Sequence, residues 1–239
     1  MLPPIRTYLK RHIPTFMRRQ RSRAERVADE LRFWDKWFKK KGLQWPDDYR
    51  SRLDPDSPLA EEYCECIEHL PQYEIRILDV GAGPLTVLGK KHPSKRLVIV
   101  AVDVLAEKYD ELLDRYHVCP AVRTTFAEAE HLTRWFAENS FDLVNARNCL
   151  DHAVDPVEAV RQMLLVTKKN CFAVLDHLEK EGEHQRYSGL HQWNFAIAEG
   201  EFLVKGAGVV TNVSRQLVHL GDFRCFLSKG WVKVRIRKK

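Results

Sequence analysis

From residue 75 onward, apolar and polar positions alternate in a pattern that predicts strands and helices in turn. The strand-sized apolar runs are 75–80, 97–102, 122–126, 141–146 and 171–175. The segments between them favour helices, which we predict at 85–91, 106–115, 130–138 and 156–166. Repeated strand–helix units of this kind predict an α/β fold with a doubly wound, mostly parallel sheet.

Two helices are predicted ahead of this unit. The first, over 24–41, rests on the helical spacing of Val27, Leu31, Trp34 and Phe38. Segment 43–58 is rich in Pro and Asp and is expected to be a loop. The second helix is predicted from Pro58, with Ser57 as its N-cap and the proline in the first helical position.

The C-terminal part follows a different pattern. Residues 202–213 and 223–236 each predict a strand, and no crossover helix of convincing length separates them. We expect them to form an antiparallel pair at the edge, as strands six and seven of a seven-stranded sheet. The expected organisation is a basic arm at 1–23, a helical extension at 24–71 and one domain at 72–239.

The net charge of +6 is unevenly distributed. Residues 1–26 carry eight Arg or Lys and one Glu, and residues 229–239 carry six basic and no acidic residues. The segment between them is therefore acidic. Basic ends predict an anionic partner such as a membrane surface, a nucleic acid or an acidic polymer. A solvated tail without a partner is the alternative.

The sequence also indicates a compartment. No apolar run approaches the roughly 20 residues of a membrane span, and the basic N-terminus is not followed by the apolar segment of a secretory signal. The six cysteines form no Cys-x-x-Cys pair and no zinc-type spacing. We therefore expect a cytoplasmic protein with free thiols, peripheral at the inner face of a membrane if the basic ends bind lipid.

The first chemical motif is the turn Asp79-Val80-Gly81-Ala82-Gly83, which directly follows a predicted strand. Glycines at such a turn let the backbone approach a ligand that a Cβ atom would block. Asp103 ends the next strand, where an acidic group can accept hydrogen bonds from both ribose hydroxyls of a nucleoside. The third glycine of a dinucleotide-binding turn is missing, since Thr86 stands in its place.

Two further segments complete an ordered series, 126–132 and 141–152, the second followed by Asp155-Pro156. This order resembles the class I, S-adenosylmethionine (SAM)-dependent methyltransferase family over residues 75–177. Leu78–Gly83 is similar to its motif I and Asp103 to its acidic motif II. Residues 127–132 resemble its "G-D-A-E-x-L" segment, and 141–156 resemble its "F-D-L-V-x-A…L-E-H…D-P" segment. The resemblance implies a Rossmann-like fold with SAM as cofactor.

The resemblance also implies roles for individual residues. Asp79 orients the methionine portion of SAM, Asp103 takes the ribose hydroxyls and Glu128 meets the adenine amino group. Residues 145–148 lie beside the sulfonium and the carboxylate. The implied SAM-binding residues are Asp79, Gly81, Ala82, Gly83, Asp103, Val104, Glu128, Ala129, Asn145, Arg147 and Asn148. Pro84 departs from the family's pattern, where many members have glycine, and Ala127 stands in place of the usual glycine.

An oxygen acceptor usually needs a base, and histidine titrates nearest to neutral pH. His152 follows the fourth strand and His177 ends the fifth, and both strand ends face the ligand crevice of such a fold. We take these two as catalytic candidates. A structural role is the alternative for His152, because the family shows this histidine with many different acceptors. Asp151 and Asp176 orient the imidazoles or, alternatively, bind a divalent metal with them; no metal site is assigned.

The segment 187–195 gathers aromatic, amide and imidazole groups that suit a polyhydroxylated ligand. The acceptor-binding candidates within it are Tyr187, His191, Gln192, Trp193 and Asn194. An ordinary structural loop with a buried Trp193 is the alternative. The polar segment 179–186 before it is expected to act as a lid.

The function expected from these features is O-methylation of a sugar, a glycan or another small-molecule hydroxyl, for example in a bacterial surface polysaccharide. An RNA- or protein-directed methyltransferase using the basic ends is one alternative, and a non-catalytic SAM-binding module is another. No Asn/Asp-Pro-Pro-Tyr motif follows the fourth strand. Its absence argues against methylation of nucleic-acid amino groups, and no sequence-specific nucleic-acid binding is expected.

Overall fold

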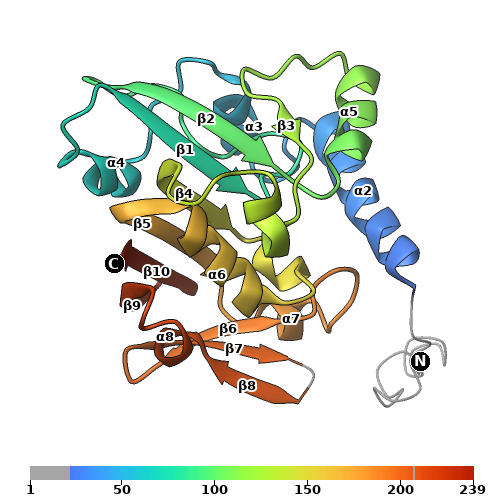
Figure 1. The fold of residues 1–239 in the computed structure, drawn as a ribbon. Helices are drawn as coiled ribbons and strands as arrows, with labels where there is room; N and C mark the ends of the chain where they lie inside the picture. Colours follow the sequence, from blue (N-terminus) through green and yellow to red (C-terminus); the bar gives the residue numbers. More distant parts are fainter. Residues whose placement is uncertain (1–21, 207) are drawn as a thin grey trace.

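The computed structural model describes residues 22–206 and 208–239. They form a large mixed sheet, a small second sheet and helices that pack on both faces of the large one (Figure 1). The predicted basic arm of residues 1–23 lies almost entirely outside the described residues, and so does most of the predicted N-terminal anionic-binding segment.

The large sheet confirms the predicted doubly wound fold. Its seven strands are ordered β3-β2-β1-β4-β5-β10-β9. The first five are parallel to one another, and β10 pairs antiparallel with both β5 and β9. The strands are β1 (Glu74–Val80), β2 (Arg96–Val102), β3 (Thr124–Thr125), β4 (Phe141–Arg147), β5 (Thr167–Leu178), β9 (Gly221–Ser228) and β10 (Trp231–Lys238).

The N-terminal helices differ in part from the prediction. Helix α2 (Arg23–Lys39) was expected, and Ser22 and Glu25 close its first turn as a capping box. Segment 43–58 is not all loop, because it contains helix α3 (Pro46–Leu53). None of its residues is buried, so the helix has no apolar face that a sequence pattern could reveal. Helix α4 (Glu61–Ile67) begins later than predicted, because Pro58 is bridged to Lys91 instead of opening the helix.

Two of the predicted crossover helices form as expected, α5 (Ala106–Arg115) and α6 (Pro156–Val166). The helix predicted at 85–91 is absent, because the Thr86 hydroxyl turns back to Asp79 and accepts the Leu88 N–H. The helix predicted at 130–138 is instead a short 3₁₀ segment, η2 (Ala129–Arg134).

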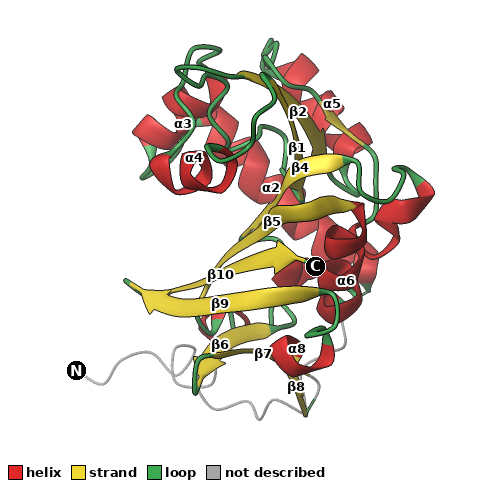
Figure 2. Cartoon of the chain, turned by 60° about the vertical axis from the view of Figure 1, so that its left-hand side comes forward, coloured by secondary structure: helices red, strands yellow, loops and turns green. Residues whose placement is uncertain are grey.

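The C-terminal prediction was right about two antiparallel edge strands and wrong about which residues form them. Segment 223–236 is a hairpin rather than one strand, since Lys229 and Gly230 turn with φ of 51° and 78°. Figure 2 shows this β9–β10 hairpin continuing the sheet beyond β5. Residues 202–206 and 209–212 belong to a separate antiparallel sheet of β6 (Asn194–Ala198), β7 (Glu201–Gly206) and β8 (Val209–Asn212).

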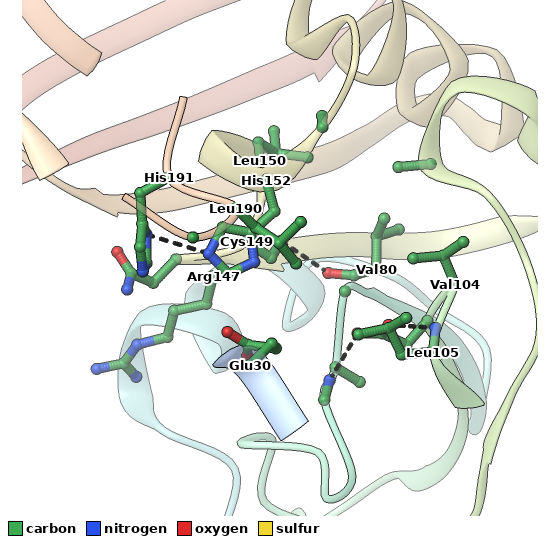
Figure 3. A pocket seen from close by; sticks show the side chains of 18 of the residues that line it. Glu30, Val80, Val104, Leu105, Arg147, Cys149, Leu150, His152, Leu190 and His191 are labelled. Carbon is green, nitrogen blue, oxygen red and sulfur yellow. Dashed lines mark hydrogen bonds between the residues drawn. The ribbon is translucent and has the colours of Figure 1, made fainter. Parts of the chain in front are cut away.

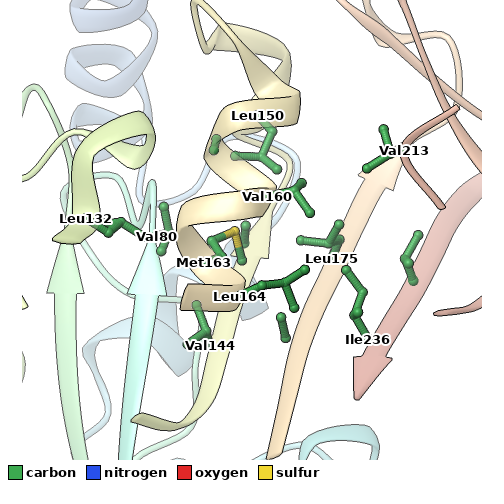
Figure 4. Packing of buried hydrophobic residues seen from close by; sticks show 14 of the residues in the cluster. Val80, Leu132, Val144, Leu150, Val160, Met163, Leu164, Leu175, Val213 and Ile236 are labelled. Atoms are coloured by element: carbon green, nitrogen blue, oxygen red, sulfur yellow. The ribbon is translucent and has the colours of Figure 1, made fainter. Parts of the chain in front are cut away.

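Alternate residues of the strands face two apolar layers. Ile75 and Ile77 pack with α4 on one face, and Leu78 and Val80 pack with α6 on the other. Figure 4 shows Val160, Met163 and Leu164 of α6 lying against β4, β5 and β10. Because every central strand is covered on both faces, the carboxyl ends of the strands are held in one place.

The basic C-terminal segment is built into the fold. Lys233 and Arg235 of β10 both form ion pairs with Asp176 of β5 and with Glu62 of α4. The Asp176 side chain is 2% exposed and that of Arg235 is 12% exposed. These cations therefore stabilise the edge of the sheet, whereas the sequence suggested a free basic arm.

We expect Asp176→Asn to lower the free energy of unfolding by roughly 3 kcal/mol, because it removes a buried carboxylate that pairs with two partly buried cations. Urea denaturation at pH 7 measures this change. As a control, Glu111→Gln removes the exposed pair with Lys108 and should cost no more than about 0.5 kcal/mol. Equal effects of the two substitutions would contradict the structural role of Asp176.

Candidate active site

A cavity of about 1310 Å³ opens at the carboxyl ends of β1, β2 and β4 (Figure 3). Ten of the eleven SAM-binding candidates line it, and Asn145 does not. The cavity also reaches residues of α2, η3 (Leu150–His152), the short helix α7 (Glu181–His184) and the loop after it. It therefore offers one side to the predicted cofactor and another to an acceptor.

The Gly-rich turn forms the floor of the cofactor side. Gly81 and Gly83 both have φ of +65°, a conformation that L side chains rarely adopt. A Cβ on Gly81 would lie 2.5 Å from the Cβ of Cys149, and one on Gly83 would lie 2.9 Å from the Trp34 ring. The two glycines are thus required by the backbone and by close neighbours.

Asp79 is buried at the end of β1 and fixes this turn. One carboxylate oxygen accepts the Thr86 hydroxyl at 2.5 Å, and the other accepts the Asn145 amide at 2.7 Å. Burial raises the pKa of Asp79 above its ordinary value, although both hydrogen bonds oppose that shift. Asn145, predicted as a cofactor contact, is instead fully buried and positions Asp79.

Asp103 lies where a ribose-binding acid was predicted, at the end of β2. Its two oxygens accept the Gly83 N–H at 3.1 Å and the Leu105 N–H at 2.8 Å. An ionised carboxylate has about four acceptor positions, so Asp103 retains capacity for two hydroxyl donors. Burial raises its pKa to about 6, although both backbone hydrogen bonds oppose that shift. Val104 follows it and lines the cavity.

The remaining candidates line the cavity from β4 and from the segment around η2. Glu128 and Ala129 come from the segment before η2 and its first residue. Arg147 lies over the Trp231 ring at 5.1 Å, and the Asn148 side chain accepts the Leu178 N–H. These residues are placed to surround an adenosyl group and its methionine portion, and their contacts with SAM stay predictions.

Helix α2 supplies part of the cavity that sequence reasoning missed. Glu30, Phe33 and Trp34 line it, and the Trp34 indole donates to Glu30 at 2.8 Å. The helical spacing predicted α2 but assigned none of its residues to a site. The polar Glu30 four residues before Trp34 was the available signal, since the two lie on one side of a helix.

His177 does not line the cavity, and we withdraw it as a candidate base. Its side chain is completely buried, its ring packs 4.5 Å from Phe195, and neither ring nitrogen has a hydrogen-bond partner among the described residues. Burial lowers the pKa of His177 to about 4. Asp176 faces the ion pairs of β10 and does not orient a catalytic imidazole.

Of the five acceptor candidates in the loop, His191 alone lines the cavity. The Trp193 indole donates to Ala153 O at 2.9 Å, and the Asn194 amide donates to the Tyr187 hydroxyl at 2.8 Å. The Gln192 amide donates to backbone carbonyls of its own loop. These four side chains hold the loop in place, which corrects their predicted contact with an acceptor.

His191 joins His152, which also lines the cavity, and the buried Asp151 in one cluster. Its Nδ1 lies 2.6 Å from Asp151 Oδ2 and 3.1 Å from His152 Nε2, and Figure 3 shows the two imidazoles facing each other. Burial alone would lower the pKa of His191, but the Asp151 carboxylate outweighs it and raises that pKa. Burial alone would raise the pKa of Asp151, but the two imidazoles outweigh burial and lower that pKa.

The buried His177 predicts a pH dependence of stability. Between about pH 6.5 and pH 4 the unfolded chain binds a proton that the folded His177 does not, so stability falls as the pH falls through this window. His177→Phe should remove this contribution. Relative to the natural protein, its unfolding free energy should rise by about 2–3 kcal/mol between pH 7.5 and pH 4.5.

Urea titrations at the two pH values measure that difference. Substituting the exposed His219 by Gln serves as the control and should leave the pH slope unchanged. A parallel pH profile for His177→Phe and the natural protein would show that His177 takes up a proton in the folded state.

Comparison with known proteins points in one direction. Residues 78–175 match the family model described as a methyltransferase domain. No curated protein sequence matches the chain. A putative SAM-dependent methyltransferase structure from Methanococcus maripaludis is similar, with a TM-score of 0.52 and 14% identity over 86% of this chain and 93% of that one.

The structure of the CurJ carbon methyltransferase is also similar, with a TM-score of 0.51 and 16% identity over 74% of this chain. The matched region spans 52% of the CurJ chain. At such identities the likeness shows the fold, while the family match covers the segment from the Gly-rich turn to β5. That match identifies residues 78–175 as a methyltransferase domain, and the ordered motifs and the seven-stranded sheet agree with the class I fold, which uses SAM as its cofactor.

Proposed function

We propose that this chain transfers the methyl group of SAM to a hydroxyl oxygen of a sugar, a glycan or another small-molecule acceptor. The observation that carries this proposal is the Asp151–His152–His191 cluster, whose two imidazoles line the same cavity as the Gly-rich turn. An oxygen acceptor has to lose its proton during transfer, and groups that assist this loss typically contribute 10²–10⁴-fold.

The residues present fit the cofactor. Asp103 keeps acceptor capacity for ribose hydroxyls, the backbone of 81–83 is free of Cβ obstruction at both glycines, and Glu128 and Ala129 lie on the same cavity wall. SAM supplies an activated methyl group on a positively charged sulfur. The chain's own contribution is to align the acceptor with that group and to keep water away, which accounts for much of the rate in such displacements.

The composition of the acceptor side supports a polyhydroxylated molecule. Aromatic surfaces of Phe33, Trp45 and Trp231 line the cavity together with Glu181. Flat apolar rings beside charged hydrogen-bonding groups suit a sugar, which has apolar faces and a rim of hydroxyls. A cavity of about 1310 Å³ has room for such an acceptor beside SAM.

An RNA- or protein-directed enzyme has less support. Three of the six cations in the basic C-terminal segment that suggested a polyanionic partner, Lys233, Arg235 and Lys239, form ion pairs within the fold. Among the described residues, no helix is long and apolar enough to cross a membrane. A peripheral role through the N-terminal cations stays a proposal, because residues 1–21 are not described.

The test uses tritium-labelled SAM with separate pools of nucleotide sugars and oligosaccharides, of RNA and of protein. We expect label in the sugar fraction, as an O-methyl group identified by mass spectrometry and NMR. Label confined to the RNA or protein pool would contradict the proposal, and so would an N- or C-methylated product.

Asp103→Ala should weaken binding of SAM or S-adenosylhomocysteine by roughly 1.5–3 kcal/mol, because charge-assisted hydrogen bonds to the ribose are lost. Isothermal titration calorimetry measures this as about a 10- to 100-fold rise in Kd. The matched control is Asp110→Ala on α5, whose carboxylate pairs with the exposed Arg123. Unchanged affinity in the Asp103 variant would remove that residue from the cofactor site.

His152→Ala should lower kcat toward the hydroxyl acceptor by about 10²–10⁴-fold. Its affinity for S-adenosylhomocysteine should change little, since the role of His152 is exercised on the acceptor side. The exposed His219→Ala serves as a control with full activity. Full turnover in the His152 variant would show that the cluster has no part in transfer.

A further inference from the structure

Three potential ligand atoms converge at the acceptor side of the cavity. Asp151 Oδ2 and His191 Nδ1 are 2.6 Å apart, His191 Nδ1 and His152 Nε2 are 3.1 Å apart, and His152 Nε2 and Asp151 Oδ2 are 3.6 Å apart. Ligands of a divalent metal at about 2.0–2.2 Å are separated from one another by roughly 2.9–3.4 Å. The three observed separations bracket that range.

The cluster is difficult to satisfy with protons alone. If His191 Nδ1–H donates to Asp151, the single proton on Nδ1 is shared between the carboxylate and the His152 Nε2 lone pair. If His152 donates to His191 Nδ1 instead, a nitrogen lone pair faces the carboxylate oxygen at 2.6 Å. At 3.6 Å, a direct bond from His152 to Asp151 is too long. One cation between the three atoms would use all three lone pairs.

The charge and burial of Asp151 support the same conclusion. Its side chain is 1% exposed, and its Oδ1 has no hydrogen-bond partner among the described residues. A buried carboxylate is costly unless it is paired or coordinates a metal. The two imidazoles are 21% and 22% exposed toward the cavity, so a cation here would keep open positions for an acceptor.

The surrounding hydrogen bonds hold these three residues in position. Asp151 and His152 belong to η3, whereas His191 lies 40 positions further along the chain. The Gln192 N–H donates to Asp151 O at 2.9 Å, and the Trp193 indole donates to Ala153 O at 2.9 Å. These two bonds clamp the loop to η3 on both sides of the cluster. Such outer contacts orient the ligands of metal sites.

The geometry points to a binding site for one divalent transition-metal cation, held by Asp151, His152 Nε2 and His191 Nδ1. Two imidazoles and one carboxylate suit Zn²⁺, Fe²⁺ or Co²⁺ better than Mg²⁺ or Ca²⁺. The role of the cation rests on the proposed function. A hydroxyl bound to it would lose its proton more readily, and the cavity-lining Glu181, 3.9 Å from His191 Nδ1, is placed to accept that proton.

The test measures cation binding directly, with chelator-treated full-length protein and Co²⁺ alone as the probe. Calorimetry should give one site with micromolar Kd. The absorption spectrum should show weak d–d bands without intense thiolate charge transfer, which separates this site from the free cysteines. His191→Gln and His152→Gln should each weaken binding by about 100-fold or more, and the exposed His219→Gln should leave it unchanged.

S-adenosylhomocysteine binding checks that each variant is folded, and the partly exposed His152 keeps the test usable if substitutions at buried Asp151 unfold the chain. Absence of a one-to-one Co²⁺ site would overturn the inference, as would equal binding in the His152 and His191 variants and the natural protein. Undiminished hydroxyl methylation in excess chelator, without Co²⁺ binding, would remove the metal and leave the proposed function standing. Cation binding together with label only in RNA would contradict the proposed function and leave the metal site standing.

Discussion

The buried carboxylate of Asp79 is the interaction on which the rest of the site depends. It ties three parts of the chain together, because β1 carries it, Thr86 reaches it from the turn that follows, and Asn145 reaches it from β4. A carboxylate taken out of water needs such partners. The Gly-rich turn is consequently held against β4, and the cavity floor takes its shape from two hydrogen bonds.

This tie also explains an irregularity of the fold. The connection from β1 to β2 has no helix, although its apolar residues suggested one. The Thr86 hydroxyl donates to Asp79 and accepts the Leu88 N–H. The backbone of Gly89 lies so close to Pro58 that a Cβ on Gly89 would lie 1.9 Å from the Pro58 carbonyl oxygen. Helix α4 covers that face of the sheet in place of the missing crossover helix.

Much of the fold and cofactor side was predictable, because strand ends and glycine turns leave local signals. The acceptor side was less so. His177 and His191 look alike in sequence, yet a strand packed on both faces buries the first, and a loop clamped by Trp193 presents the second. The missed turns at Glu199–Gly200 and Lys229–Gly230 did carry a signal, since each pairs a polar residue with glycine at positive φ. The pairing of β10 with β5 depends on contacts far apart in sequence, which no local pattern reports.

The position of β10 has a consequence for how the sheet is assembled. A ribosome makes β9 before β10, yet β10 lies between β9 and the rest of the sheet. Strand β9 therefore has no place to dock until the later strand has emerged, and the free edge of β5 stays open during that interval. Open strand edges are sites of mispairing. The tight Lys229–Gly230 turn shortens this exposure, because it lets the hairpin form locally and add to β5 as one unit.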